Sequence, residues 1–346
     1  MSRTTTRSQR LHHLALLTVT VATALTLTAC GSGGDTDGKA AHTASASPTP
    51  TGVVTAKAAA TALDHYENIN NQANKTVKTD KAKAGTLLRT VEGGQVNAQS
   101  LADYELFTTW TAKKQSYYGS GFTYERRKYL IPQAGSASWF AVQATASGSK
   151  NESLIIFDKA DGTYKVVAAV YADGKLPIPK AALDKHGLAT AIDPAKRVGA
   201  LAPDQLSTAF EDLAETGGKK TGGKLASTRA TKAAVQLYTD RDKDKNSKYA
   251  TTKYFATDVK ARKVYALRLA DGGVLTVFPT AHNQETMLRP PYMSSYKIDP
   301  NKEEAVYNSS GRVVITDEFQ GQALAQLTPS SKPQVIAREY RMVDSR

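Results

Sequence analysis

Cysteine is almost absent from this sequence of 346 residues, and its single copy, Cys30, lies near the N-terminus. One cysteine cannot form a disulfide within the chain or supply a metal site built from several thiolates. Histidine is also scarce, and no two copies after residue 30 have the i, i+4 spacing of a metal-binding helix. These copies are His42, His65, His186 and His282. The serine-hydrolase pattern Gly-x-Ser-x-Gly does not occur, so the sequence offers no catalytic signature.

The first 30 residues have the order of charge and hydrophobicity that is typical of an export signal. The start is basic, with Arg3, Arg7 and Arg10, and no acidic residue precedes Cys30. An apolar stretch then covers 11–27 and leads through small residues to the cysteine. This stretch is shorter than the about 20 apolar residues that span a bilayer, which argues against a transmembrane signal anchor.

The segment Leu27-Thr28-Ala29-Cys30 resembles the lipobox of bacterial lipoproteins. The resemblance implies cleavage between Ala29 and Cys30 and attachment of a diacylglyceryl group, with fatty acyl chains such as palmitate, to the Cys30 sulfur. Two or three acyl chains hold a protein stably at a membrane, because each buried methylene contributes about 0.8 kcal/mol. We therefore expect a lipid-anchored protein on the outer face of the cell membrane, with no free thiol. The alternative is a secreted protein whose cysteine lies there by chance.

The formal net charge is +13, and removing the three arginines of the leader leaves 42 basic and 32 acidic residues, or +10. Basic proteins bind nucleic acid or anionic membrane and wall surfaces. Export favours the second kind of partner. We expect the protein to contact the membrane through the lipid on Cys30, and to contact an anionic envelope polymer or another envelope protein, but not nucleic acid. The basic residues are scattered along the chain, which also suits an ordinary solvated surface.

The composition changes twice after the leader. Segment 30–52 consists mostly of Gly, Ser, Thr, Ala, Asp and Pro, which cannot bury a core, and it predicts a disordered tether. Apolar residues with helical spacing then return, with one stripe formed by Ala59, Leu63, Tyr66 and Asn70. Further helical patterns cover 87–91 and 100–108, the latter opened by a capping box of Ser100 and Asp103. Strands are predicted at 122–131, 138–145, 153–157 and 164–171.

The second half of the chain repeats the order of helices followed by strands. Helices are predicted after Pro203 and over 228–238, with a Gly/Lys loop at 217–224 between them. Strands follow at 248–255, 264–269, 274–278, 312–327 and 334–343. We interpret the chain as a signal peptide at 1–29, a lipidated cysteine and tether at 30–52, and two domains at 53–195 and 196–346.

This order of elements, together with the Leu-Thr-Ala-Cys leader, resembles a family of uncharacterised actinobacterial, Streptomyces-like lipoproteins. The resemblance implies tandem α+β domains of the NTF2-like or cystatin-like type, in which helices pack into a curved antiparallel sheet. NTF2-like folds include enzymes and pure binding modules, so the fold class does not fix the activity.

Several short motifs were compared with known functional patterns, and each fails at a required position. The loop 218–224 resembles a phosphate-binding loop, but Leu225 stands where the magnesium ligand Ser or Thr is needed. Ser147 with Lys150, and Ser294 with Lys297, fit Ser-x-x-Lys but lack a helical context. The alternating acids of 240–246 lack the glycine and glutamate of a calcium loop.

Tyrosine is abundant, with 16 copies, and two groups of it fall in possible loops. Tyr117-Tyr118 and the pair Tyr292 and Tyr296 predict packing residues or, where exposed, the rim of a ligand or glycan site. His65 lies about 200° around its helix from Leu63, which predicts a surface position.

The sequence therefore favours a membrane-anchored binding or adaptor lipoprotein of the cell envelope. An NTF2-like enzyme with a buried Asp or Glu as its acid–base group is one alternative, and a structural spacer is another. No catalytic residue, cofactor or metal ligand is assigned.

Overall fold

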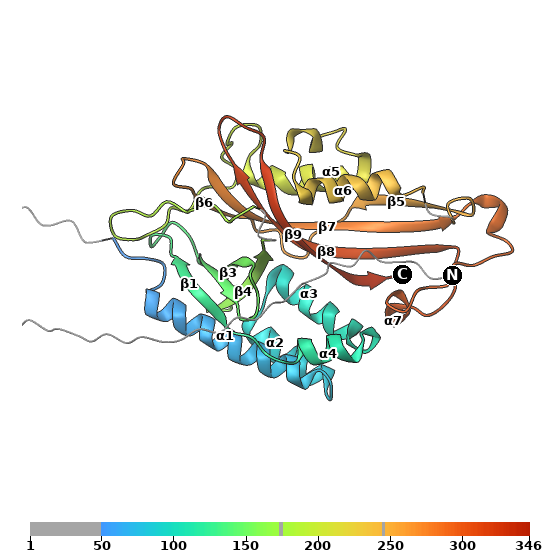
Figure 1. Cartoon of the computed structure of the whole chain (residues 1–346), viewed down its shortest axis with the longest axis horizontal. Helices are drawn as coiled ribbons and strands as arrows, with labels where there is room; N and C mark the ends of the chain where they lie inside the picture. Colours follow the sequence, from blue (N-terminus) through green and yellow to red (C-terminus); the bar gives the residue numbers. More distant parts are fainter. Residues whose placement is uncertain (1–49, 173–175, 244–245) are drawn as a thin grey trace, which may run out of the picture.

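The computed structural model describes residues 50–172, 176–243 and 246–346. Ala29 and Cys30, the predicted cleavage and lipidation sites, lie outside the described residues, as do His42 and most of the predicted tether. Figure 1 shows four layers: the helices of the first half, its sheet, the sheet of the second half, and the helices α5 and α6. No helix within the described residues is long and apolar enough to span a membrane.

The first half places its helices before a four-stranded antiparallel sheet in the order β1-β2-β3-β4. Thr55 caps the N-terminus of α1, because its hydroxyl accepts a hydrogen bond from the Ala58 amide (3.1 Å). The Asp80 carboxylate caps the N-terminus of α2 in the same way. The helices are α1 (Ala56–Thr76), α2 (Lys81–Val91), α3 (Gly94–Glu105), η1 (Leu106–Thr109) and α4 (Ala112–Tyr118). The strands are β1 (Tyr124–Leu130), β2 (Trp139–Ala146), β3 (Glu152–Ala160) and β4 (Thr163–Tyr171).

The second half also begins with helices, and its antiparallel sheet has the order β5-β7-β8-β9 with β6 paired to β7. The helical segments are η2 (Pro203–Gln205), α5 (Leu206–Thr216), η3 (Gly222–Lys224), α6 (Arg229–Asp240), η4 (Pro290–Tyr292) and α7 (Glu304–Tyr307). The strands are β5 (Ala250–Ala256), β6 (Tyr265–Arg268), β7 (Val274–Leu288), β8 (Val314–Leu327) and β9 (Gln334–Ser345).

The two sheets pack face to face and share a hydrophobic core. Neighbouring residues of a strand point to opposite faces, so each sheet sends one set of side chains into this core and the other set toward its own helices. In β3, Ile155 and Phe157 face the helices of the first half, whereas Leu154 and Ile156 face the second sheet. The second sheet divides its residues in the same way: Leu275 of β7 faces the first sheet and Phe278 faces α5. Both faces of β2, β3 and most of β7 are therefore buried, which explains their nearly continuous apolar runs, whereas the edge strands β1 and β5 are partly exposed.

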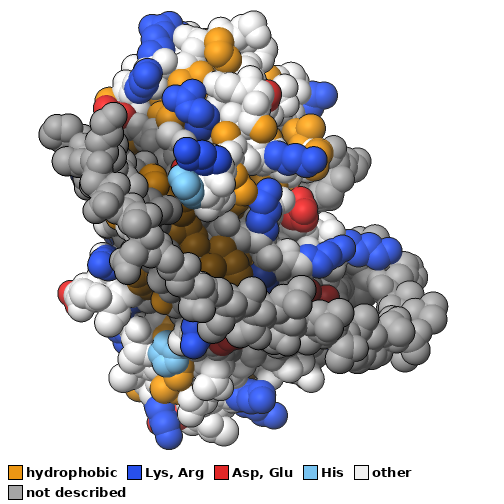
Figure 2. All heavy atoms as spheres, turned by 90° about the vertical axis from the view of Figure 1, so that its left-hand side faces the viewer, with side chains coloured by type: hydrophobic (Ala, Val, Ile, Leu, Met, Phe, Trp, Pro, Cys, Tyr) orange, Lys and Arg blue, Asp and Glu red, His pale blue; other side chains and the backbone are white. Residues whose placement is uncertain are grey.

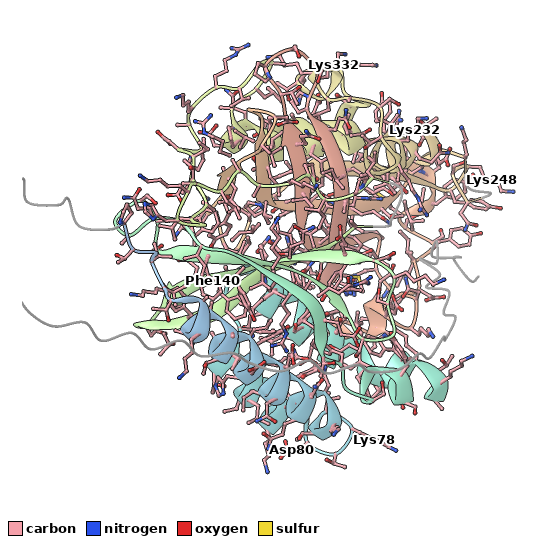
Figure 3. The ribbon with its side chains drawn as sticks, turned by 60° about the vertical axis from the view of Figure 1, so that its left-hand side comes forward. Lys78, Asp80, Phe140, Lys232, Lys248 and Lys332 are labelled. Carbon is pink, nitrogen blue, oxygen red and sulfur yellow. The ribbon has the colours of Figure 1, made fainter. Side chains whose placement is uncertain are left out.

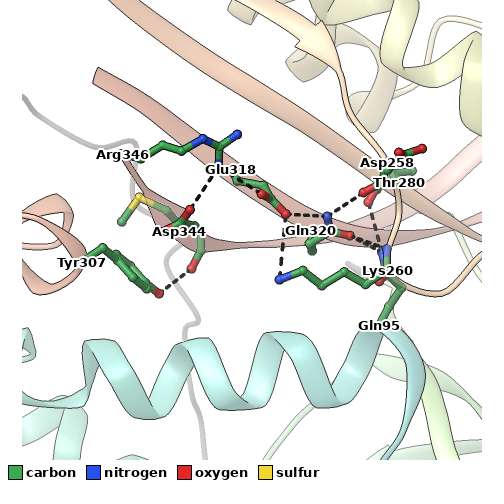
Figure 4. Close-up of polar contacts among 10 residues, drawn as sticks. Gln95, Asp258, Lys260, Thr280, Tyr307, Glu318, Gln320, Asp344 and Arg346 are labelled. Atoms are coloured by element: carbon green, nitrogen blue, oxygen red, sulfur yellow. Dashed lines mark hydrogen bonds and ion pairs between the residues drawn. The ribbon is translucent and has the colours of Figure 1, made fainter. Parts of the chain in front are cut away.

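A group of buried glutamines joins α3 to the second sheet (Figure 4). Gln95 Nε2 donates to Gln320 Oε1 (3.0 Å) and to the Gly321 carbonyl (2.9 Å). Gln322 Nε2 donates to Gln99 Oε1 and to the Ala169 carbonyl, both at 2.9 Å. These bonds pair polar groups that both halves bury, so the halves meet through specific contacts as well as through apolar packing.

The start of the described chain is fixed to the edge of the first half. The Val53 amide donates to the Pro132 carbonyl (2.9 Å), and the Ala134 amide donates to the Thr51 carbonyl (2.8 Å). Gly52 lies between these bonds, where a Cβ atom would approach Ile131 Cγ2 to 2.6 Å. The chain after residue 50 is thereby held against the segment that follows β1.

The predicted α+β class with antiparallel sheets is confirmed. The capping box at Ser100 and Asp103 is wrong, because α3 begins at Gly94 and Ser100 lies within it. Strand β7 continues ten residues beyond the predicted end at 278. Its Pro279 is tolerated because it falls between the stretches that pair with β6 and β5, where no partner needs its missing N–H.

Candidate ligand-binding pocket at the junction of the two halves

A pocket of about 600 Å³ opens where the helices of the first half meet β8 and β9. One wall comes from α1 and α3, and another from the segment between α4 and β1 and from the turn at 146–151. The second half closes the pocket with Gln322 of β8 and with Glu339 and Arg341 of β9. Pockets of roughly 300–1,000 Å³ hold small ligands in other proteins, so the size is suitable for one.

The segment between α4 and β1 is held in place by Asn71 of α1. The amide nitrogen of the Asn71 side chain donates to the Phe122 carbonyl (2.7 Å), and its oxygen accepts from the Phe122 amide (2.9 Å). Gly121 beside it has a φ of +80°, a conformation that favours glycine. This pairing fixes the aromatic ring of Phe122 in the pocket wall.

A chain of buried polar side chains runs along the pocket wall and ends at a carboxyl group. Tyr104 Oη donates to Asn74 Oδ1 (2.8 Å), and Asn74 Nδ2 donates to Asn70 Oδ1 (2.7 Å). Asn70 Nδ2 and Tyr66 Oη both donate to Oε1 of Glu92, at 3.0 and 3.2 Å. Tyr66, Asn70 and Asn74 all line the pocket, so Glu92 lies directly behind its wall.

Glu92 is the first residue after α2 and is only 2% exposed. Burial raises the pKa of Glu92 from 4.5 to about 8, although the polar side chains of Ser100, Tyr66, Asn70 and Asn97 act in the opposite direction. The carboxyl group is therefore largely protonated at neutral pH. Burial and the nearby Glu92 also raise the pKa of the Tyr66 hydroxyl, which stays neutral and acts as a donor.

The one cation of the pocket lining, Arg341, is paired with two carboxylates, so the described charged residues of the pocket carry a net charge of −1. Arg341 Nε lies 2.9 Å from Asp103 Oδ1, and Arg341 Nη1 lies 3.7 Å from Glu339 Oε2. The attraction of Asp103 raises the pKa of the guanidinium, which remains charged. The pocket thus presents an internal ion group together with neutral polar side chains, and not an excess of positive charge.

A second buried polar cluster lies outside this pocket, under α5. Tyr340 Oη donates to Glu211 Oε1 (2.6 Å), and His282 Nδ1 lies 3.2 Å from Glu211 Oε2. The His282 ring stacks on Phe319 with a centroid distance of 5.1 Å. His282 is 6% exposed and Glu211 is 4% exposed. The cluster is therefore packed inside the second half, and Glu211, His282 and Tyr340 do not line the candidate pocket.

The loop that resembles a phosphate-binding loop already holds an anion of its own. Asp212 Oδ2 accepts hydrogen bonds from three successive backbone amides, at 2.8–2.9 Å. These amides belong to Lys220, Thr221 and Gly222. Burial alone would raise the pKa of Asp212, but the bonds from Thr216 and from these amides hold it below its usual range. The Asp212 carboxylate fills the place where a phosphate would bind.

The other motif residues lie on the surface or at the pocket mouth. Ser147 and Ser149 line the pocket in the turn after β2, while Lys150 is exposed. Ser294 and Lys297 are exposed after η4 and do not lie at the pocket. His65 and His186 are exposed, as the sequence predicted for His65. Residues 244 and 245 of the acidic segment lie outside the described residues, and no group of three potential metal ligands occurs within the described ones.

The two tyrosine groups differ in location. Tyr117 and Tyr118, on α4, both line the pocket; Tyr117 is 51% exposed and Tyr118 packs on Trp110. Tyr292 is the last residue of η4, and Tyr296 follows it. Neither residue lines the pocket, and Tyr296 is 63% exposed. Only the first group therefore joins the candidate site.

Basic side chains are spread over the faces of the described residues that Figures 2 and 3 present. Figure 2 shows Lys and Arg distributed singly over the face that it presents. In Figure 3, Lys232 and Lys332 lie on the outside of the second half and Lys78 lies at the far end of α1. This distribution provides no single basic patch on these faces.

Comparison with known proteins places the chain in a family. Residues 50–346 match a family model described as a domain of unknown function, DUF8094. The chain belongs to the DUF8094 family. An uncharacterized lipoprotein of Streptomyces coelicolor is 31% identical over 290 residues, which cover 81% of this chain and 78% of that protein. The predicted similarity to a Streptomyces lipoprotein is thereby confirmed.

The pocket of this DUF8094 chain is lined by residues that the sequence did not single out, above all Gln99, Gln322 and Arg341, and Glu92 lies behind its wall. A signal was present in α1, where Asn70 interrupts an apolar stripe and Asn74 follows at i+4. Polar residues on the buried face of a helix need buried partners. The partners themselves lie far away in the sequence, so the pattern could not identify them.

Proposed function

We propose that this protein is a lipid-anchored binding protein of the cell envelope and that the pocket between its halves is the ligand site. The observation that carries this proposal is the pocket of about 600 Å³, walled by neutral polar and aromatic side chains from both halves. A pocket with convergent polar groups is the usual form of a small-molecule site.

The anchor rests on the lipobox and on the lipoprotein relative. Cys30→Ser should abolish labelling by a fatty acid and release the protein from the outer face of the membrane into the medium. Ser32→Ala, two residues away, serves as the control and should keep both labelling and retention. Unchanged membrane retention of the Cys30→Ser protein would disprove the anchor.

The proposal includes two α+β domains, 53–195 and 196–346, of the NTF2-like or cystatin-like type. It is supported by the same order in both halves, helices before an antiparallel sheet. The two domains pack through their shared core, so they form one structural unit with the pocket at their junction.

A variant that fills the pocket tests the binding function. Ala146→Trp places a large ring in the pocket wall, whereas Ser136→Trp adds the same ring on an exposed turn. The protein is incubated with envelope extract, re-isolated, and examined by native mass spectrometry. We expect the wild type and Ser136→Trp to retain a ligand and Ala146→Trp to lose it. Equal retention by all three proteins, or by none, would exclude the pocket as a ligand site.

An enzyme with Glu92 as its acid–base group is the second candidate function. It is supported by the buried carboxyl group, its raised pKa and its hydrogen bond from Tyr66 beside the pocket. Glu92→Gln keeps the shape and removes the proton. Conversion of the retained ligand by the wild type but not by Glu92→Gln would establish this function, and recovery of unchanged ligand from the wild type would argue against it.

A further inference from the structure

We propose that the pocket binds an uncharged, polyhydroxylated ligand, namely a neutral saccharide or a neutral segment of a glycan. This inference rests on the proposed function of the pocket as a ligand site and adds the chemical class of the ligand.

The lining is dominated by aromatic rings, side-chain amides and hydroxyl groups. The aromatic residues are Tyr66, Tyr117, Tyr118, Phe122 and Tyr171, and the amides are Asn70, Asn74, Gln99, Asn151 and Gln322. Four serines add hydroxyl groups. A sugar ring has a C–H face, which packs on an aromatic ring, and hydroxyl groups, which need both donors and acceptors. The N–H groups of Asn70, Gln99 and Gln322 already bond within the protein, and the oxygens of these amides retain lone pairs that can accept. Asn151 and the serines of the lining carry both donors and acceptors, so the lining matches this ligand.

The lining does not match an apolar ligand. Among the residues that the structure describes, its aliphatic side chains are Val96, Ala146 and Ala169, and the two alanines offer single methyl groups. A fatty acid or another lipid chain needs a continuous aliphatic surface, because its binding energy comes from burying methylene groups. Here such a chain would displace water from amides and serines without replacing their hydrogen bonds.

The lining does not match a strongly charged ligand either. Arg341 is its only cation within the described residues, and it is paired with both Asp103 and Glu339, so the group carries a net charge of only −1. An anionic ligand would have to compete with Asp103 for the guanidinium. A cationic ligand would have to compete with Arg341 for Asp103 and Glu339, and displacing the guanidinium from Asp103 is costly in a half-buried site.

The polar wall is also held rigidly, as recognition of hydroxyl groups requires. Asn70 and Asn74 are fixed by their bonds to Glu92 and Tyr104, and Gln99 is fixed by Gln322. A wall that is ordered before binding loses little side-chain entropy when the ligand arrives. Tyr117 contributes a half-exposed ring at the mouth, where the face of a sugar can pack.

Titration calorimetry on the full chain in detergent tests this inference. The neutral probes are chitotetraose, cellotetraose, maltotetraose and mannotetraose, and the comparison compounds are tetragalacturonate, spermidine and palmitate. We expect at least one neutral saccharide to bind and the three comparison compounds to bind at least tenfold more weakly. Tyr117→Ala should weaken saccharide binding by about threefold to tenfold through loss of ring packing, whereas Tyr117→Phe should retain it.

The control is Tyr296→Ala, which removes an exposed tyrosine away from the pocket and should leave binding unchanged. If native mass spectrometry shows that the retained ligand is a lipid or a strongly charged compound, the saccharide inference is wrong and the binding pocket stands. If a saccharide binds equally to the wild type and to Ala146→Trp, the inference is also wrong, because the sugar then binds elsewhere. Failure of every neutral saccharide, both the four probes and those of a broad neutral glycan array, overturns it as well.

Discussion

The hydroxyl of Tyr66 donates a hydrogen bond to Glu92 Oε1 across 3.2 Å, and both side chains are almost completely buried. Tyr66 belongs to α1 and Glu92 follows α2, so the bond joins two helices at the wall of the pocket. A buried acid with a raised pKa connects the stability of the protein to pH.

We expect the folded state to lose stability as the pH rises from about 4.5 to about 8. The folded chain keeps the Glu92 proton in this range, whereas the unfolded chain releases it above its ordinary pKa of 4.5. The free energy of unfolding therefore falls by at most about 1.4 kcal/mol per pH unit. The fall stops above the pKa that Glu92 has in the folded state. Glu92→Gln should remove this slope and be more stable than the wild type at pH 8.5. Urea unfolding of both proteins at pH 5 and pH 8.5 measures this change in the free energy of unfolding.

The control for this experiment is Glu125→Gln, which changes an exposed glutamate of β1. It should show the same dependence on pH as the wild type. Parallel curves for the wild type and Glu92→Gln over this range would contradict the raised pKa.

Asp212→Asn should destabilise the protein by about 1–3 kcal/mol, because the three backbone amides that bond to the carboxylate then lose their charged acceptor. The pKa of Asp212 is lowered, so its contribution is present above pH 4 and disappears as the pH falls below the folded pKa. Limited proteolysis should also cut the variant within 217–224 sooner. Glu215→Gln, which removes only an exposed ion pair with Lys220, should behave like the wild type.

Arg126→Gly should stabilise the protein by about 0.5–1 kcal/mol. Arg126 has a φ of 52° in the bulge between Glu125 and Lys128, a conformation that costs an L-residue energy and costs glycine none. Glu125→Gly, at the neighbouring residue with ordinary backbone angles, should instead destabilise β1. Thermal melting of the three proteins compares them, and a lower melting temperature for Arg126→Gly would show that the arginine is favoured there.

Gln322→Ala should destabilise the protein by about 3 kcal/mol while leaving unfolding in one transition. The side chain bonds to Gln99 and to both backbone groups of Ala169, so its loss removes a partner in the second half from buried groups of the first half. Gln326→Ala in the same strand removes only a bond to Asp271 near the surface and should cost less than 1 kcal/mol. Scanning calorimetry that resolves two separate transitions in the wild type would contradict joint unfolding of the halves.

Most local elements could be predicted from the sequence because their signals are local, but α4 was not predicted, since none of its residues is buried and it has no apolar stripe. Alternating and continuous apolar runs predicted each strand that the structure describes, and the stripe that contains Leu63 and Tyr66 predicted α1. The extent of β7 beyond Pro279 could not be predicted, since a proline ordinarily argues against a central strand. Only the pairing with β5 and β6 on either side of this residue explains why it is tolerated.

The candidate site could be predicted only in fragments. Tyr117 was recognisable as a possible rim residue, and Asn70 lay on a helical stripe. Their assembly with Gln322 and Arg341 depends on how the two sheets pack, which involves residues more than 200 positions apart. Glu92 had no distinguishing neighbour in the sequence, because its burial and raised pKa arise from three helices and β4 around it.

The pairing of Thr51 and Val53 with the segment after β1 has a mechanical consequence. If a lipid holds the chain on the N-terminal side, any pull between the folded part and the membrane reaches the fold at Thr51. Two backbone hydrogen bonds, from Val53 to Pro132 and from Ala134 to Thr51, bear this load before α1 does. The rim of the first sheet, and not the pocket, is therefore the part of the protein that force would open first.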